Sequence, residues 1–360
     1  MRAAGWVFVT TLIAASATAA VTTWKLAPKT GEWIGAASLD DAATATICFS
    51  STHPLHSRIV QTRDGNVIRE IQIDGFAINK IQRIGPAATS NLFFVGGSLL
   101  SEYTYRLIRL TDSGVVTMWD AVRLPFGFVH DNAVVAMSDD GQVWGAAVAR
   151  QNDEVEIFAG SSGSGALLLR SKLTVKLSGS LEPGYNAEGM SVVVISSIPS
   201  HPVLAVSVHG LTYIIQNGND PVKAVLTSPY GGSAVAWQAA TSTLWVHGGY
   251  GHWPAFQIPA AGPGRGAELH SAAVLSPNTI GGEGDDPNVL PLPSGDVAVD
   301  FRDHGRRTIG FTTRGQASIA HRIALLEAGR NSIVILSPSG SSALILPTGT
   351  RSSIAHVRTF

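Results

Sequence analysis

The segment from His247 to Trp253 (His-Gly-Gly-Tyr-Gly-His-Trp) carries the most distinctive set of chemically capable side chains in the sequence. Its glycines expose the loop, and the rings of Tyr250, His252 and Trp253 suit stacking on a sugar or another planar ligand while hydrogen-bonding its edge. Two histidines could also share Zn²⁺ or Cu²⁺, but no third ligand stands nearby. The alternative is structural, with Trp253 packed between neighbouring elements. We therefore treat Tyr250, His252 and Trp253 as ligand-binding candidates.

A second segment, Gly-Glu-Gly-Asp-Asp-Pro at 282–287, is acidic. Asp285 and Asp286 offer the carboxylate oxygens that Ca²⁺ prefers. The order of residues does not match an EF-hand loop, and a solvated acidic loop is the alternative. The sequence thus marks Asp285 and Asp286 as the candidate site for a divalent cation such as Ca²⁺, and it indicates no other cofactor.

Two arrangements of these residue types would support chemistry on carbohydrates. Glu188 together with Asp285 or Asp286 would supply the pair of carboxylates that glycoside hydrolysis needs. A base such as His304 or Tyr250, with Arg306 neutralising a uronate, would instead support proton abstraction in a polysaccharide lyase. Gly-x-Ser-x-Gly, His-Glu-x-x-His and P-loop motifs are absent from the sequence, so serine hydrolase, zincin and nucleotide-hydrolysing activities have no support.

The elements that must position these side chains are strands. Outside the first twenty residues, no stretch of 12 residues has the apolar spacing of an amphipathic helix. Apolar runs of five to eight residues are instead separated by Asp-Gly, Ser-Gly or Asn-Asp turns. The clearest unit runs from Asn132 to Leu173 and contains four such strands, which would form one antiparallel sheet, a blade.

The same four-strand pattern recurs along the chain. The expected blades span 33–73, 80–121, 132–173, 191–228, 233–275, 288–325 and 332–360. Their spacing averages about 50 residues, which is typical of propeller repeats. The last blade holds only three strands, and the alternating segment 22–27 (Thr-Thr-Trp-Lys-Leu-Ala) would supply the fourth and cover its open edge. The prediction is an all-β, seven-bladed β-propeller of four-stranded antiparallel blades, closed by an N-terminal strand in the last blade.

The chain resembles secreted bacterial β-propeller proteins in this repeat pattern, over nearly its whole length and without a motif of one enzyme family. It lacks the regular Gly-His and Trp-Asp pairs of WD repeats. The segment Asp139-Asp140-Gly141-Gln142-Val143-Trp144 is similar to the Asp-box of sialidase propellers, but Met137 replaces the expected Ser or Thr and no other blade repeats the motif. A β-sandwich, or several small β domains, is the structural alternative.

Functional residues are expected on one face of the disc. Connections from strand one to two and from three to four are minimal turns, whereas those from strand two to three and from blade to blade are long and carry His, Tyr, Trp and acidic residues. Long loops on a rigid scaffold concentrate binding and catalysis. Residues just before the innermost strands should approach the central opening, among them His130, Asp131 and Glu188.

Composition restricts the setting and the partners. The basic Arg2, the apolar run after it and the Ala-Thr-Ala ending at Ala19 predict a signal peptide over 1–19, leaving residues 20–360 as one periplasmic or secreted domain. The apolar run is too short for stable insertion in a membrane. With 25 basic and 26 acidic residues, the chain has no surplus for nucleic-acid binding. The single cysteine, Cys48, lies in an apolar strand and is expected to be buried.

Three functions remain open at this point. We expect an exported propeller that binds a small ligand, glycan or protein through its His-rich, aromatic and acidic face. The alternative is a secreted glycoside hydrolase or polysaccharide lyase that uses the same face, because propellers host both. The third is a structural interaction module, which predicts a flat apolar patch near Phe126 and Phe128. The sequence does not decide whether the protein is an enzyme.

Overall fold

The fold was analysed in a computed structural model, and it is built from strands. The structure describes residues 20–83, 92–98, 104–110, 122–127, 133–150, 154–175, 190–208, 211–216, 234–248, 251–263, 269–276, 288–312, 318–329, 332–347 and 354–360. In these ranges the one helical element is a short 3-10 turn, η2 (Ala239–Thr241). The expectation of an all-β chain is confirmed.

The described strands form antiparallel sheets in the order of the sequence. The first is β2 (Trp33–Leu39), β3 (Ala45–Thr52), β4 (Leu55–Arg63) and β5 (Asn66–Asp74). The second is β6 (Ala77–Arg83), β7 (Leu92–Ser98), β8 (Thr104–Leu110) and β9 (Val122–Gly127). The third is β10 (Ala133–Met137), β11 (Val143–Ala149), β12 (Glu154–Ser161) and β13 (Leu167–Thr174). The fourth shows three described strands, β14 (Met190–Ser196), β15 (Val203–Val208) and β16 (Leu211–Gln216).

The remaining three sheets continue the pattern. The fifth is β17 (Val235–Gln238), β18 (Thr243–Val246), β19 (Trp253–Gln257) and β20 (Ser271–Leu275). The sixth is β21 (Asn288–Pro291), β22 (Val297–Asp303), β23 (Arg306–Thr312) and β24 (Ile319–Ala324). The seventh is β25 (Ile333–Leu336), β26 (Ser342–Leu346), β27 (Ile354–Thr359) and, from the other end of the chain, β1 (Val21–Lys25). β1 pairs antiparallel with β27, with Val21 opposite Arg358 and Lys25 opposite Ile354.

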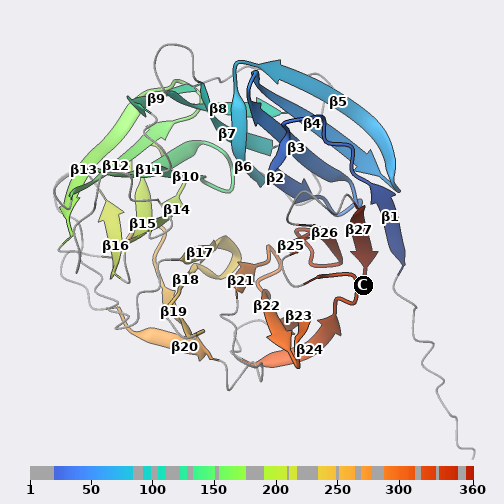
Figure 1. The fold of residues 1–360 in the computed structure, drawn as a ribbon. Coiled ribbons are helices and arrows are strands. Elements are labelled where there is room, and N and C mark those ends of the chain that lie inside the picture. Colours follow the sequence, from blue (N-terminus) through green and yellow to red (C-terminus); the bar gives the residue numbers. More distant parts are fainter. Residues whose placement is uncertain are drawn as a thin grey trace, which may run out of the picture.

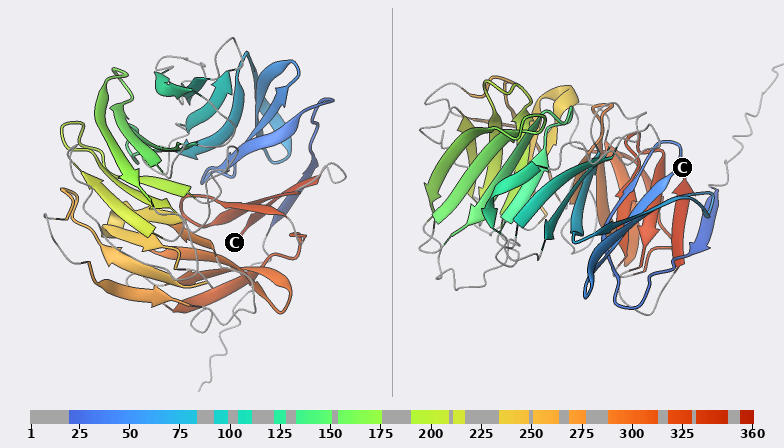
Figure 2. Two further views of the ribbon diagram at one scale, coloured as in Figure 1. Left: turned by 60° about the vertical axis from the view of Figure 1, so that its left-hand side comes forward. Right: turned by 90° about the horizontal axis from the view of Figure 1, so that it is seen from above.

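The sheets follow one another around a central axis, each with its first strand innermost (Figure 1). Seen from above and obliquely, they stand side by side as the walls of a disc (Figure 2). Middle strands such as β3 and β15 are buried along nearly their whole length, because sheets pack against both of their faces. The outer strand β13 instead alternates between exposed and buried residues, as expected for a strand with one solvent-facing side.

Apolar clusters fill the spaces between neighbouring sheets. One cluster joins β11, β12 and β13 to β14, β15 and β16, and a second joins β26 and β27 to β2, β3 and β4. Five further clusters lie between the other successive sheets in the described part of the chain. Burial of these side chains between sheets is the main source of stability, at about 25 cal/mol for each Å² of apolar surface removed from water.

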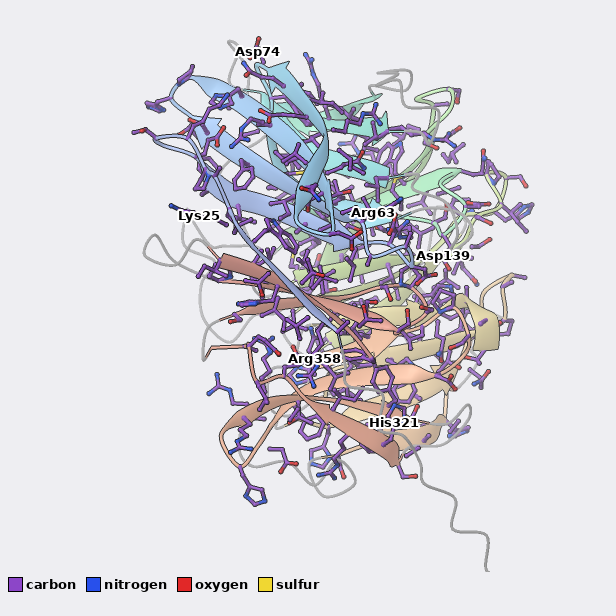
Figure 3. All side chains as sticks on the ribbon, turned by 90° about the vertical axis from the view of Figure 1, so that its right-hand side faces the viewer. Lys25, Arg63, Asp74, Asp139, His321 and Arg358 are labelled. Atoms are coloured by element: carbon purple, nitrogen blue, oxygen red, sulfur yellow. The ribbon has the colours of Figure 1, made fainter. Side chains whose placement is uncertain are left out.

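The two faces of the disc differ in the connections that they carry (Figure 3). Arg63 and Asp139 lie at hairpin turns toward one face, whereas Lys25 and Asp74 end strands that lead to the next sheet and lie toward the other. The turn after Arg63 is minimal because Asp64 and Gly65 adopt positive φ angles of 51° and 77°, which reverse the chain within two residues. We refer to the face with Lys25 and Asp74 as the crossover face.

The strand boundaries agree closely with the predicted blades except in the second sheet. The innermost strands of the third to seventh sheets begin at residues 133, 190, 235, 288 and 333, against predicted starts near 132, 191, 233, 288 and 332. The prediction that the second blade ends at Ala121 was wrong, because its fourth strand is β9, within a segment expected to be a loop. Pro125 is tolerated there, since β9 is an edge strand and needs no N–H bond on its outer side.

Candidate functional site

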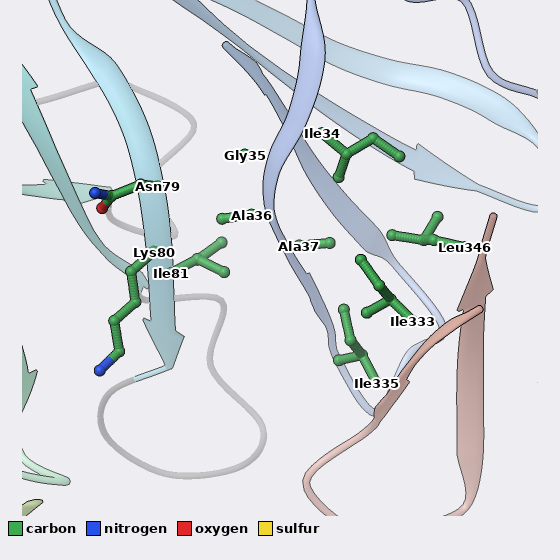
Figure 4. A pocket seen from close by; sticks show the side chains of 10 residues that line it. All are labelled: Ile34, Gly35, Ala36, Ala37, Asn79, Lys80, Ile81, Ile333, Ile335 and Leu346. Atoms are coloured by element: carbon green, nitrogen blue, oxygen red, sulfur yellow. The ribbon is translucent and has the colours of Figure 1, made fainter. Parts of the chain in front are cut away.

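The strongest candidate site lies at the axis, where three innermost strands meet. A pocket of about 280 Å³ opens between β2, β6 and β25, with one residue from β26 (Figure 4). It is lined by Ile34, Gly35, Ala36, Ala37, Asn79, Lys80, Ile81, Ile333, Ile335 and Leu346. We call it the axial pocket. Its lining comes from strands rather than loops, so its shape is set by the packing of the sheets.

Two β-bulges shape the wall of the axial pocket. Pairing slips by one residue at Gly35 in β2 and at Asn79 in β6, so each of these residues has no partner in its ladder. A bulge bends its strand and changes the direction of the side chains around it. Gly35 is required by its surroundings, because a Cβ there would lie 2.1 Å from the carbonyl oxygen of Ile78. The two innermost strands therefore approach each other more closely than side chains would allow.

Buried hydroxyls fix this approach. Ser50 Oγ donates to the carbonyl oxygen of Ile78 at 2.6 Å, and Ser57 Oγ accepts from the N–H of Ile78 at 2.7 Å. Ser57 Oγ also donates to the carbonyl oxygen of Phe76 at 2.8 Å. Both serines are fully buried, so these bonds satisfy backbone groups that would otherwise be unpaired. The first sheet thus holds β6 in place beside β2.

One side of the axial pocket is aliphatic and partly open to solvent. Ile34, Ile333, Ile335 and Leu346 line this side, and Figure 4 shows them grouped opposite Asn79 and Lys80. Ile333 keeps 40% of its surface exposed, and Trp33, which begins β2, keeps 44%. β2 and β25 are in contact, and both begin at the crossover face. Exposed apolar side chains therefore surround the opening of the pocket on that side.

The other side of the axial pocket carries one cationic group, Lys80. Its Nζ donates a hydrogen bond to the carbonyl oxygen of Val135 on β10, the innermost strand of the next sheet. Burial lowers the pKa of the Lys80 amine to about 8. Among the described residues no carboxylate forms an ion pair with it. The pocket therefore combines an aliphatic wall with a partly desolvated amine that has no acidic partner there.

A second polar cluster surrounds Glu32, between β1 and β2. The Glu32 side chain is fully buried, and its carboxylate accepts bonds from Arg58 Nη2 at 2.7 Å, Arg58 Nε at 3.1 Å and the Lys29 N–H at 2.7 Å. His56 Nε2 lies 3.2 Å from the same carboxylate. Burial raises the pKa of Glu32, but these hydrogen bonds and the Arg58 charge outweigh it and bring the pKa down to about 2. This cluster is fully satisfied internally and ties the segment after β1 to β4.

Most residues predicted to bind ligand lie outside the described part of the chain. These are His130, Asp131, Glu188, Tyr250 and the predicted cation ligands Asp285 and Asp286. In the described residues no group of three or more His, Cys, Asp or Glu side chains could hold a metal ion. The predicted signal peptide, residues 1–19, and Phe128 also fall outside the described ranges. These predictions stay open.

His252 and Trp253 have different environments despite being adjacent. His252 is exposed, and its carbonyl oxygen accepts the Gly248 N–H at 2.6 Å, which closes the loop. Trp253 is only 3% exposed and belongs to the apolar cluster between the fifth and sixth sheets, with its ring 5.0 Å from that of His247. This burial corresponds to the structural alternative left open for Trp253, and it leaves little of the indole surface for stacking on a ligand.

His304 and Arg306 belong to a tight hairpin rather than a long loop. Asp303 pairs with Arg306 across the ends of β22 and β23, and the turn between them has positive φ angles at His304 (48°) and Gly305 (77°). The His304 side chain is 83% exposed, with Nε2 3.7 Å from Asp303 Oδ1. Both residues stand in solvent on the crossover face and do not line the axial pocket.

Sequence reasoning missed the strand residues that form the axial pocket. It placed function in loops, so Ile34, Lys80 and Ile333 were assigned only to strands. A signal was present in Ile78-Asn79-Lys80-Ile81, where a lysine interrupts an apolar innermost strand. A lysine at a position that faces the centre of a ring of sheets is rarely left without a function, because burying its charge costs free energy.

Comparisons with known proteins add the fold to this geometry. No protein family and no curated protein matches the sequence. Solved structures do match. The β-propeller domain of Cps50 (Swd1) from Myceliophteria thermophila gives a TM-score of 0.53 at 10% identity, over 92% of this chain and 98% of that one. Sqt1 from Chaetomium thermophilum, bound to the N-terminus of the ribosomal protein L10, gives 0.52 at 12% identity, over 91% and 84%. This chain folds as a β-propeller.

The likeness extends over the whole propeller. A chain of the mitotic checkpoint complex matches with a TM-score of 0.51 at 10% identity, over 100% of this chain and 98% of that one. At such identities the comparison establishes the fold and no activity. No helix in the described part of the propeller is long and apolar enough to cross a membrane.

Proposed function

We propose that this propeller is a binding protein that engages a protein partner at its axis, through the opening of the axial pocket on the crossover face. The observation that carries the proposal is the exposure of Trp33 and Ile333 beside an aliphatic pocket. Exposed apolar groups around a concave opening are typical of interaction sites. The fold provides a rigid rim for them, since the pocket is made from strands.

The similar structures support a protein as the partner. Sqt1 is bound to a segment of another protein, the N-terminus of ribosomal protein L10, and the third structure is a chain of a multiprotein complex. Binding to a protein requires only a rigid surface with apolar anchors and a polar rim. In the described residues of this propeller, Trp33 and Ile333 are the anchors and Asn79 and Lys80 are polar neighbours.

We further propose that the seven sheets are the blades of one closed ring, with β1 completing the last blade. Apolar clusters occur between each successive pair of sheets, including the pair formed by the seventh and first. Polar bonds cross several of these interfaces as well. Gln82 exchanges bonds of 2.8 and 3.0 Å with the backbone of Met137, and Gln238 donates to Asp296 O at 2.7 Å. A closed ring would keep the axial pocket rigid.

The protein is proposed to act outside the cytoplasm, after removal of residues 1–19. The proposal rests on the basic, apolar and small-residue pattern of this segment. Expression of the full-length chain in a bacterial host, followed by cell fractionation and N-terminal sequencing, tests it. We expect the mature protein in the periplasm or medium with Ala20 as its first residue. A cytoplasmic protein that retains Met1 would contradict the assignment.

Site-specific photo-crosslinking tests the binding surface. A photoreactive phenylalanine analogue at Trp33 or Ile333 should crosslink one partner in cells of the native host. The same analogue at Val67 on β5 or Ile354 on β27, which are 59% and 46% exposed, is the matched control. With the purified partner, Ile333→Asp should weaken binding at least tenfold while Ile354→Asp does not. Crosslinks only from the controls, or binding unchanged by Ile333→Asp, would contradict the proposal.

A further inference from the structure

The axial pocket has two chemically distinct sides at a short separation. Its aliphatic side is formed by Ile34, Ile333, Ile335 and Leu346, and its polar side by Asn79 and Lys80 (Figure 4). A group that fills the pocket must therefore carry an apolar part and a polar part close together. The pocket volume of about 280 Å³ is at the lower end of the range for ligand sites, so it suits one compact group and not an extended chain.

Charge determines which polar part fits. Lys80 brings a cationic amine to the pocket, and no described carboxylate pairs with it. Its bond to the Val135 carbonyl oxygen occupies one of the three donors of the ammonium group. Because an unbalanced charge in a desolvated site is costly, an anionic oxygen beside Lys80 would restore the lost interaction. A second cation in the ligand would be repelled for the same reason.

We infer that the axial pocket captures the C-terminal residue of a partner protein when that residue is Leu, Ile or Val, with its side chain on Ile34, Ile333 and Leu346 and its α-carboxylate on Lys80. The inference deepens the proposed function and rests on it. A C-terminal residue joins an aliphatic side chain to a carboxylate through a single carbon, which matches the compact pocket. A free amino acid would add an ammonium group beside Lys80, whereas in a peptide this nitrogen is a neutral amide.

The inference is tested with fluorescent peptides and the full mature chain. The probe is a Gly/Ser peptide that ends in Leu with a free carboxylate, and the comparison is the same peptide with a C-terminal amide. Fluorescence anisotropy should show the acid binding at least tenfold more tightly than the amide at pH 7. The preference should decrease between pH 7 and pH 10, because Lys80 loses its charge in this range. Equal binding of the two peptides would overturn the inference.

Variants separate the two sides of the pocket. Lys80→Met should reduce binding of the acid to the level of the amide, whereas Lys172→Met, on the outer strand β13, should leave it unchanged. Ile333→Ser should weaken both peptides at least fivefold, whereas Ile354→Ser should weaken neither. Circular dichroism and thermal melts confirm that each variant is folded. Binding of the acid unchanged by Lys80→Met would overturn the inference.

Two further arms distinguish the source of the carboxylate and the fate of the proposed function. If octanoate competes as well as the acid peptide, the pocket recognises free aliphatic carboxylates and the assignment to a protein C-terminus fails. If a crosslinked partner binds through Ile333 but its affinity does not change when its C-terminal residue is removed, the C-terminal inference fails while the proposed function stands. Loss of partner binding on removal of an aliphatic C-terminal residue supports both.

Discussion

The carboxylate of Glu32 and the guanidinium of Arg58 form a buried two-point contact, with Nη2 2.7 Å and Nε 3.1 Å from the two carboxylate oxygens. Arg58 Nη2 also donates to the carbonyl oxygen of Ala27 at 2.7 Å, and the guanidinium lies 4.7 Å from the centre of the Phe49 ring. Arg58 stands on β4, whereas Ala27 and Glu32 belong to the segment that leads from β1 to β2. The pair therefore attaches the N-terminal strand of the seventh sheet to the first sheet.

Replacement of Glu32 by Gln should destabilise the propeller. The change leaves the Arg58 charge buried with only the half-exposed Glu70 at 3.5 Å, and loss of one partner from a buried pair costs about 3–5 kcal/mol. Chemical denaturation measures the difference in unfolding free energy. Glu154→Gln is the control, because Glu154 pairs with Lys172 on the surface and should change stability by less than about 1 kcal/mol. Equal effects of the two variants would show that the buried pair contributes nothing special.

The same carboxylate predicts a specific acid response. The pKa of Glu32 is about 2 in the folded chain, below its ordinary value of 4.5, so the folded state holds this proton less tightly than the unfolded state. Its stabilising contribution is present above pH 4.5 and is lost as pH falls from about 4.5 to about 2. Thermal melts of wild type and Glu32→Gln should therefore converge over this range. A difference in Tm that stays constant from pH 6 to pH 2.5 would contradict the assignment.

Replacement of Gly35 by Ala should disturb the wall of the axial pocket. The added Cβ would lie 2.1 Å from Ile78 O and 2.7 Å from Ser50 Oγ, so β2 and β6 must separate, at a cost of about 1–3 kcal/mol. Gly163→Ala is the control, because nothing lies within 4 Å of its added carbon. Denaturation midpoints of the two variants provide the comparison. If Gly35→Ala is as stable as Gly163→Ala, the close approach of the two strands is not required.

Removal of β1 should expose the edge of β27. A chain that begins at residue 26 lacks the strand that pairs with Ile354 to Arg358, and open strand edges associate with one another. We expect a lower Tm and aggregation detectable by light scattering. A chain that begins at residue 20 retains β1 and should remain monodisperse. Equal behaviour of the two chains would show that ring closure by β1 is dispensable.

Cys48 should resist thiol reagents until the chain unfolds. Its side chain is fully buried in the cluster between the first and second sheets, and burial raises the pKa of its thiol. The reactive thiolate is therefore both rare and inaccessible. A chromogenic disulfide reagent should label the native protein at the rate of global unfolding and the denatured protein at once. Ser164→Cys, at an exposed turn, supplies the positive control; fast labelling of native Cys48 would contradict its burial.

The sequence alone determined the strands, their grouping into antiparallel sheets and most sheet boundaries, because these depend on local signals. Apolar alternation and turn residues such as Asp64 and Gly65 fix strands and hairpins within a few residues of each other. The burial of Cys48 followed from the same pattern. The second sheet escaped this reasoning, since β9 contains Pro125 and lies after a long connection from β8.

Only the tertiary structure decided which side chains meet. Ile34, Lys80 and Ile333 are far apart in the sequence and become neighbours because three innermost strands converge at the axis. Trp253, which belongs to a segment rich in glycine, is buried because the fifth and sixth sheets pack around it. Periodicity records which face of a strand is apolar, but not which other strand that face will contact, since that depends on packing between sheets.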